Sequence, residues 1–351
     1  DGANWKPFQM NLPITAIRDL HIRDNMLIAA THGRSFWMID DLGPLQQLSN
    51  DVAKASHHLY KPKPSYRMAQ RSPRGRNELL EGENHPNGVL LNYFVKGYDG
   101  SQTVELRFEE MDGDVIRSFS NKSKDRRTKL NVSASNNRFV WDMRYPGFKE
   151  FKGLVLYSSP NLGPKAVPGT YVAKLIVDGK EVSQNFDIIK DPRLPNSAED
   201  YQQQFDYLIA VRDKVSEAHQ AIIDIRSLRA DFDYYRSKFA GDDAFAATKA
   251  AIDAFDKDMA IIENNIHMTK NQARQDPLNF GIRINNRLAF LMADQQRGDF
   301  IPTDQAVEFK DQVSAELDVE LNALDQLISA RLGNINELGS GLGIKILSSR
   351  N

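Results

Sequence analysis

The chain has 351 residues, of which 41% are hydrophobic and 26% charged, and its formal net charge is −2. This is the composition of a globular protein with more than one core, and the near-neutral charge gives no electrostatic argument for nucleic acid. The absence of cysteine excludes disulfides, thiolate nucleophiles and cysteine-ligated zinc, but it fixes no compartment. The apolar runs are too short to span a bilayer, so we expect no transmembrane segment. Because the chain begins Asp1-Gly2, we expect a fragment or a processed product.

Residues 1–48 are predicted to form short strands. The stretch from Ile14 to Ile22 alternates between apolar and polar residues, Asp24-Asn25 is a turn signal, and Met26 to Thr31 is mainly apolar. Phe36 to Ile39 is a further apolar run, which follows a turn at Gly33. Three or four strands with this much apolar surface cannot bury it alone, so we expect neighbouring sheets to cover them.

Two segments of this region resemble a known family. The N-terminus resembles the end of an Asp-box, the turn of sialidase-like and sortilin-like propeller blades, at Asp1-Gly2-Ala3-Asn4-Trp5, where Asn4 replaces the motif's Thr. The closing blade of such repeats is similar to Thr31-His32-Gly33-Arg34-Ser35-Phe36-Trp37, where Ser35 replaces the second Gly. The chain as a whole is similar to the C-terminal part of bacterial sortilin-like, BNR-repeat propeller proteins, many of which are labelled glycosyl hydrolases. The resemblance implies that residues 1–48 are the last strands of a β-propeller whose other blades are missing.

The sequence after this region changes character twice. Residues 49–86 are rich in Pro, Gly and charge, so we predict a linker. Residues 87–190 contain about seven short alternating runs with turn signals between them, which predicts a β-sandwich of immunoglobulin or fibronectin type. We expect Trp141 in the core of this sandwich and Tyr171 as a corner tyrosine. Residues 141–147 and 163–171 resemble signature segments of the same family's sandwich domain.

Residues 191–338 carry apolar residues at alternating steps of three and four. This spacing predicts four amphipathic helices in an antiparallel bundle, with Ser197 and Thr303 as the N-caps of the first and the last helix. Residues 339–351 are rich in Gly and Ser and are predicted to be a loose tail, in which Ile344 and Ile346 have the pattern to dock as a strand. The predicted fold class is therefore multi-domain β plus α: terminal propeller strands, a sandwich and a helical bundle.

The segment from Thr31 to Leu42 holds the candidate ligand contacts, which are His32, Arg34, Asp40 and Asp41. Glycoside hydrolysis needs two carboxylates that face each other across a bond, whereas adjacent strand residues point to opposite faces. Asp40 and Asp41 are therefore poor candidates for a catalytic pair, and we expect one of them to cap a turn or to pair with Arg34. His32 and Arg34 fall in the hairpin turn, where Arg34 would bind a carboxylate ligand or form a structural salt bridge.

The remaining polar clusters predict no cofactor, no metal and no catalytic residue. His57 and His58 are adjacent and therefore diverge, and His219 and His267 lack the neighbours of a di-iron bundle. The sequence contains no glycine-rich phosphate loop that leads into a helix and no nucleophile elbow. Basic residues gather in residues 67–76 and 122–129, which we interpret as solvated loops, with an acidic partner such as an anionic glycan as the alternative.

The resemblance implies a non-catalytic region of a secreted or periplasmic protein, with a signal peptide upstream. Its function would be ligand or protein recognition and domain docking, with the upstream blades and a protein, peptide or glycan ligand as partners. The alternative is an accessory region of a sialidase-like or xyloglucanase-like glycoside hydrolase whose catalytic carboxylates lie upstream, so whether the whole protein is an enzyme stays open. A third hypothesis makes the helical bundle an oligomerisation or complex-docking element.

Overall fold

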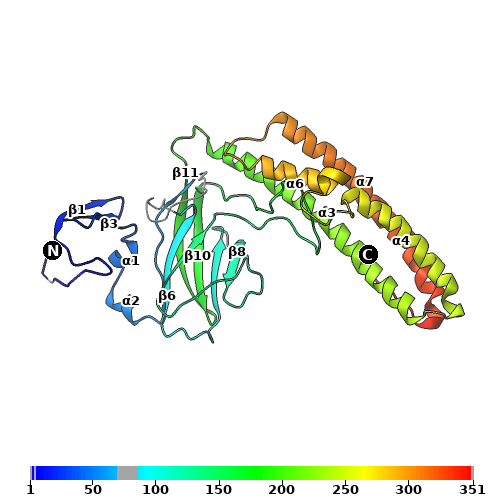
Figure 1. The fold of residues 1–351 in the computed structure, drawn as a ribbon, viewed down its shortest axis with the longest axis horizontal. Helices are drawn as coiled ribbons and strands as arrows, with labels where there is room; N and C mark the ends of the chain where they lie inside the picture. The colour runs from blue at the N-terminus through cyan, green and yellow to red at the C-terminus, as the bar shows by residue number, and fades with distance from the viewer. Residues whose placement is uncertain (1, 4, 69–85, 349–351) are drawn as a thin grey trace. The chain divides into compact units, whose positions relative to one another are not determined.

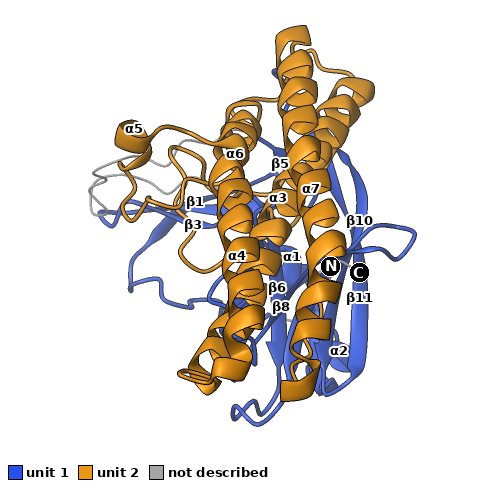
Figure 2. Ribbon diagram, turned by 90° about the vertical axis from the view of Figure 1, so that its right-hand side faces the viewer, with its two compact units in different colours: residues 1–143, 168–194 blue, residues 144–167, 195–351 orange. Residues whose placement is uncertain are grey.

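The structure is a computed structural model that describes residues 2–3, 5–68 and 86–348, and it divides into two compact units (Figures 1 and 2). Unit 1 comprises residues 1–143 and 168–194, and unit 2 comprises residues 144–167 and 195–351. The polypeptide therefore passes from one unit to the other after Met143, Val167 and Leu194. Among the described residues, no helix combines the length and the apolarity that a membrane span requires. Asp1 and Asn4 of the Asp-box-like segment lie outside the described residues, as do residues 69–85 of the expected linker.

Unit 1 begins with a three-stranded antiparallel sheet. Its strands are β1 (Ile17–Arg23), β2 (Met26–Thr31) and β3 (Phe36–Ile39), and β2 lies in the middle. The β1–β2 turn is formed by Asp24 and Asn25, which both have positive φ, a conformation that Asp and Asn tolerate better than most residues. The short helix α1 (Gly43–Gln46) follows, and then α2 (Asn50–Lys54), whose N-cap Ser49 accepts a hydrogen bond from the backbone N–H of Val52.

The rest of unit 1 consists of two β-sheets. The larger sheet has the strand order β5 (Ser65–Arg67), β11 (Lys180–Lys190), β10 (Gly169–Val177), β7 (Val104–Glu109) and β8 (Val115–Ser120). The smaller sheet has the order β4 (His57–Leu59), β6 (Val89–Val95) and β9 (Asn136–Trp141). The segment expected to be a linker thus supplies α2, β4 and β5. Strands β4 and β5 have only three residues each, too short for a periodic pattern, and pairing with β6 and β11 places them.

Aromatic rings from both sheets meet in the core of unit 1. Trp141 on β9 stacks on Phe108 of β7 with ring centroids 4.4 Å apart, and Phe186 of β11 lies edge-on to Trp141 at 6.0 Å. Tyr171 of β10 stacks on Phe186 in turn. Because these rings belong to both sheets and are nearly or fully buried, the two sheets pack face to face. The core position predicted for Trp141 is confirmed.

The helices of unit 2 are α3 (Ala198–Lys238), α4 (Ala246–Ile266), α5 (Pro277–Phe280), α6 (Ile284–Asp294) and α7 (Asp304–Leu338). Ser197 and Asp200 form a capping box at the start of α3, and Thr303 caps α7. Figure 1 shows α4 running back along α3, with α6 continuing in the same direction and α7 returning. The four predicted helices therefore do not lie side by side, because α4 and α6 follow each other along the longer α3 and α7.

Residues 144–167 form a strap that packs against these helices. Phe148 and Phe151 belong to the helical core, and the backbone N–H of Lys149 donates to Ser216 Oγ on α3 at 3.1 Å. These residues were expected in the sandwich because they lie between two predicted strands. At the other end of the chain, Ile344 and Ile346 are buried in the same core without forming a strand, so this part of the expected loose tail is docked.

Candidate functional site

His32 and Arg34 lie in the turn between β2 and β3, where both residues are exposed. The backbone of Arg34 holds the turn, because its N–H donates to Thr31 Oγ1 at 3.1 Å and its carbonyl accepts from Trp37 Nε1 at 2.9 Å. The guanidinium of Arg34 has no ion-pair partner among the described residues, so the expected pairing with Asp40 or Asp41 does not form. The turn therefore presents one cation and one imidazole to solvent.

Asp40 is tied to a distant strand. Its carboxylate accepts a hydrogen bond from Nη2 of Arg138 on β9 at 2.7 Å, and both side chains remain 43% or more exposed. Its backbone carbonyl accepts from Lys63 Nζ at 3.0 Å. An exposed pair of this kind contributes about 0–1 kcal/mol to stability, so Asp40 is a surface contact.

Asp41 is largely buried and has several partners. Its Oδ1 accepts from the backbone N–H of Gly43 at 2.9 Å and from Asn25 Nδ2 at 3.2 Å, and its Oδ2 accepts from Asn92 Nδ2 at 3.2 Å. Its side chain is 10% exposed, and Lys63 Nζ lies 3.8 Å away. The carboxylate thus holds the turn into α1 and connects it to β6, which agrees with the expected capping role. A carboxylate with this many donors is already satisfied and is a poor acid or base.

The sheet β1–β3 exposes large apolar side chains on both faces. The register places Leu20, Ile22, Leu27 and Trp37 on one face, where Leu20 is 60% and Ile22 65% exposed. Phe36 and Met38 lie on the other face and are 76% and 58% exposed. Over the first face, residues 8–12 enclose an apolar cavity of about 240 Å³ that Leu20, Leu27 and Trp37 line. Single exposed apolar residues are ordinary, but large exposed apolar side chains on both faces of one small sheet indicate a binding surface.

A buried polar layer lies in unit 2. Asn285 Nδ2 is 3.1 Å from His219 Nε2 and 3.2 Å from His267 Nδ1, and His219 Nδ1 hydrogen-bonds the carbonyl of Lys149 in the strap. The ring of Phe151 lies edge-on to both imidazoles at 5.0 Å. Because the amide of Asn285 donates to both rings, both histidines are neutral acceptors at these atoms. Burial lowers the pKa of each histidine to about 4.

Sequence reasoning considered His219 and His267 only as metal ligands and missed this layer. The residues of the layer are far apart in the chain, and no local spacing connects them to the strap. Among the residues that the structure describes, no group of three or more His, Cys, Asp or Glu side chains is arranged to hold a metal ion. The layer therefore fastens the strap to the helices.

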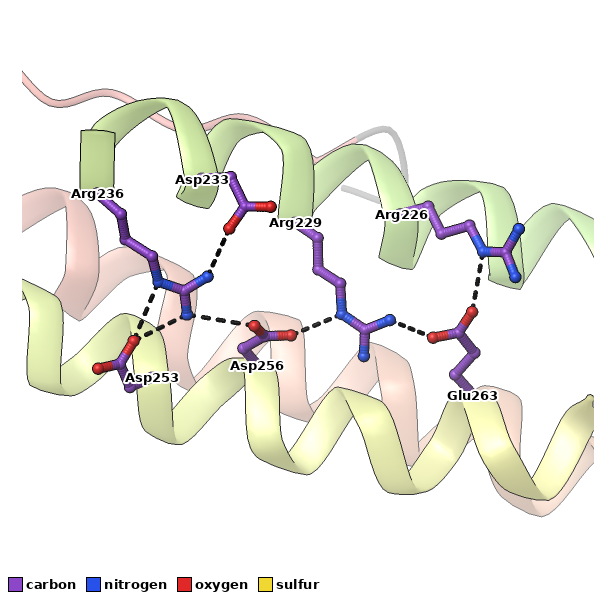
Figure 3. A network of polar contacts seen from close by, with 7 residues as sticks. All are labelled: Arg226, Arg229, Asp233, Arg236, Asp253, Asp256 and Glu263. Carbon is purple, nitrogen blue, oxygen red and sulfur yellow. Dashed lines mark hydrogen bonds and ion pairs between the residues drawn. The ribbon is translucent and has the colours of Figure 1, made fainter. Parts of the chain in front are cut away.

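Three arginines of α3 face three carboxylates of α4 in a ladder (Figure 3). Arg226 Nε donates to Glu263 at 2.9 Å, Arg229 Nε donates to Asp256 at 2.6 Å, and Nη2 of Arg236 donates to Asp253 at 2.8 Å. Arg229 also donates to Glu263, whose side chain is only 3% exposed. Arg236 also donates to Asp233 of its own helix at 2.9 Å. The ladder therefore joins the two helices through paired charges.

Comparisons with known proteins give no family for this chain. No family model matches it, and no curated protein matches it. A solved structure named pT26-6p is 9% identical, covers 68% of this chain and has a TM-score of 0.14. The chain spans 47% of that structure. A likeness at this level carries no argument about fold or function, so the proposals below rest on the residues and their geometry.

Proposed function

We propose that this chain is the non-catalytic C-terminal region of a secreted sortilin-like propeller protein, which acts in ligand or protein recognition and in domain docking. The observation that carries the proposal is the sheet β1–β3, which exposes apolar side chains on both faces. Propeller blades are small antiparallel sheets arranged radially against one another, so each face of a blade is covered by a neighbour. The sequence likeness of residues 31–37 to a closing blade supports the same assignment.

The non-catalytic role is supported by the state of the two candidate carboxylates. Asp41 is held by Gly43, Asn25 and Asn92, and Asp40 is paired with Arg138. Neither is aimed at the other across an open site. In the alternative, where the full-length protein is a glycoside hydrolase, the acid and the base would lie upstream, and the turn with His32 and Arg34 would contribute contacts to a ligand. We interpret the two-sheet part of unit 1 as an immunoglobulin-like accessory domain in both cases.

Hydrogen exchange tests the docking role. We expect the backbone amides of β1 and β3 to exchange fast in the 351-residue chain and to become at least about tenfold more protected in the natural longer protein, because apposed blades cover both faces. The double substitution Phe36→Ser with Met38→Ser should lower the melting temperature of the longer protein. The matched control is Met111→Ser with Val115→Ser, two exposed apolar residues near the β7–β8 turn, which should not. Equal exchange of β1 and β3 in both proteins would overturn the proposal.

Enzyme assays distinguish the glycoside hydrolase alternative from the non-catalytic role. Hydrolysis of any member of a polysaccharide panel by the longer protein would establish the glycoside hydrolase. Retention of that activity after Asp40→Asn and Asp41→Asn in a folded protein would place the catalytic carboxylates elsewhere.

A further inference from the structure

The strap and a turn between α4 and α5 line an open cavity of about 590 Å³. All of its walls belong to unit 2. One wall is formed by strap residues, chiefly Leu154, Val155, Leu156, Ser158 and Asn161, and the other is formed by residues 272–274. The volume lies in the range of sites that hold small ligands.

The strap wall offers backbone groups that have no partner. Val155 and Leu156 belong to no helix or strand, and within the described part of the chain their backbone N–H and C=O groups make no hydrogen bond. The segment is nevertheless fixed at both ends. The N–H of Leu154 donates to the carbonyl of Phe151 at 3.2 Å, and the N–H and C=O of Tyr157 both bond the side chain of Asn286, at 2.8 and 3.1 Å. Unpaired backbone groups that are fixed in place can pair with the backbone of an extended peptide, as the edge strand of a sheet does.

The opposite wall offers an unpaired cation. The carboxylate of Asp276 shapes this turn by accepting the backbone N–H groups of Gln272 and Ala273 at 2.7 Å each. Arg274 is exposed, and its guanidinium has neither a hydrogen bond nor an ion pair with any described residue. The carboxylate of Glu150, on the strap wall, already accepts from Asn161 Nδ2 at 2.8 Å. The cation that remains available for a ligand is therefore Arg274, and a guanidinium prefers a carboxylate in bidentate geometry.

We propose that this cavity binds an extended peptide segment that carries a carboxylate. The peptide backbone pairs with Val155 and Leu156, its apolar side chains contact Leu154, Leu156 and Pro160, and its carboxylate binds Arg274. The site lies within unit 2 and does not use the β1–β3 sheet. A test of this site therefore does not depend on whether the β1–β3 sheet is a propeller blade.

The test is selection and binding with the 351-residue chain. Random octapeptides displayed with free C-termini are selected on the protein, and the affinity of a selected peptide is measured by fluorescence anisotropy. We expect Arg274→Glu to weaken binding by at least about tenfold, because it replaces an ion pair with repulsion. Ala273→Trp, which fills the cavity, should weaken binding to a similar degree. Arg297→Glu is the control, since this exposed arginine lies outside the cavity and pairs with Asp294, and it should bind as the parent does.

Two methylated versions of the selected peptide test the backbone pairing with the strap. Methylation of alternate backbone amides on the edge that faces the strap should remove binding, and methylation of the other edge should not. Failure to enrich any peptide, or equal affinity for the parent, Arg274→Glu and Ala273→Trp, overturns the site. If Arg274→Glu unfolds in circular dichroism, Arg274→Gln takes its place with the same expectation. Equal affinity of the two methylated peptides overturns the backbone pairing.

Discussion

Nη2 of Arg138 lies 2.7 Å from the carboxylate of Asp40, although the two residues are 98 positions apart in the sequence. This contact joins the end of the β1–β3 region to β9. The neighbouring Asp41 has the opposite character, because its carboxylate is largely buried and accepts three hydrogen bonds. The two adjacent aspartates therefore have different structural roles, and single substitutions can test each role separately.

We expect Asp41→Ala to lower the free energy of unfolding of unit 1 by about 1–3 kcal/mol, because it leaves buried donors without an acceptor. Asp40→Ala should change it by less than about 0.5 kcal/mol, since the pair with Arg138 is exposed. The measurement is urea unfolding followed by tryptophan fluorescence. The chain has three tryptophans, and all of them lie in unit 1, so the signal reports this unit alone. Equal effects of the two substitutions would contradict the assignment.

The buried histidine layer predicts an acid-sensitive unit 2. The folded pKa values of His219 and His267 are about 4, below the ordinary value of 6.5, so the unfolded state binds more protons between these limits. The stability of unit 2 should therefore be unaffected by these groups above about pH 6.5 and fall as the pH drops toward 4. The loss is on the order of 3 kcal/mol for each histidine.

Helical circular dichroism in urea at pH 7.5, 6.0 and 5.0 measures the part of this loss that falls above pH 5, about 2 kcal/mol for each histidine. The double substitution His219→Gln with His267→Gln should flatten the dependence between pH 6.5 and 5, because glutamine does not titrate. His21→Gln is the control, since His21 is exposed on β1. A pH dependence that survives in the double variant would assign it to other groups.

The ladder between α3 and α4 should depend most on its buried member. Glu263→Ala removes a buried carboxylate that accepts from Arg226 and Arg229. We expect the free energy of unfolding of unit 2 to fall by about 1–3 kcal/mol, because Arg226 is 36% exposed and Arg229 keeps its bond to Asp256. Asp233→Ala removes a carboxylate that is 72% exposed and should cost less than about 0.5 kcal/mol. Thermal unfolding at 222 nm compares the two variants. If Glu263→Ala destabilises unit 2 no more than Asp233→Ala does, the ladder contributes little to the stability of this unit.

Two glycines of unit 2 should respond in opposite directions to alanine. A Cβ on Gly163 would lie 1.8 Å from the carbonyl oxygen of Tyr145, so Gly163→Ala forces the strap to move and should destabilise unit 2. Gly333 lies inside α7 with nothing within 4 Å of an added Cβ, so Gly333→Ala should stabilise the helix by about 0.5–1 kcal/mol. Both are measured by the same unfolding experiment, and a stabilising Gly163→Ala would refute the close approach.

The sequence predicts the elements of this chain better than their contacts. Periodic runs identify β1, β2 and the long helices, and the caps Ser197 and Thr303 place two helix starts. The strap is not predicted because residues 144–167 have no period, and what holds them is packing of Phe148 and Phe151 against helices that begin only at Ala198. The turn-holding role of Asp41 follows from its position before a proline-containing turn. Its bond to Asn92 depends on β6 and has no local signal.

The strap also determines which stretches of the gene encode a complete unit 2. A segment that starts at residue 195 encodes every helix of unit 2 but omits Phe148, Phe151 and the Lys149 carbonyl that His219 binds. A segment that starts at residue 144 restores them, but it also includes residues 168–194, which form β10 and β11 of unit 1. The helical unit is therefore not encoded by one continuous stretch of the gene. It cannot be cloned, exchanged or transplanted as one continuous piece without carrying part of its neighbour.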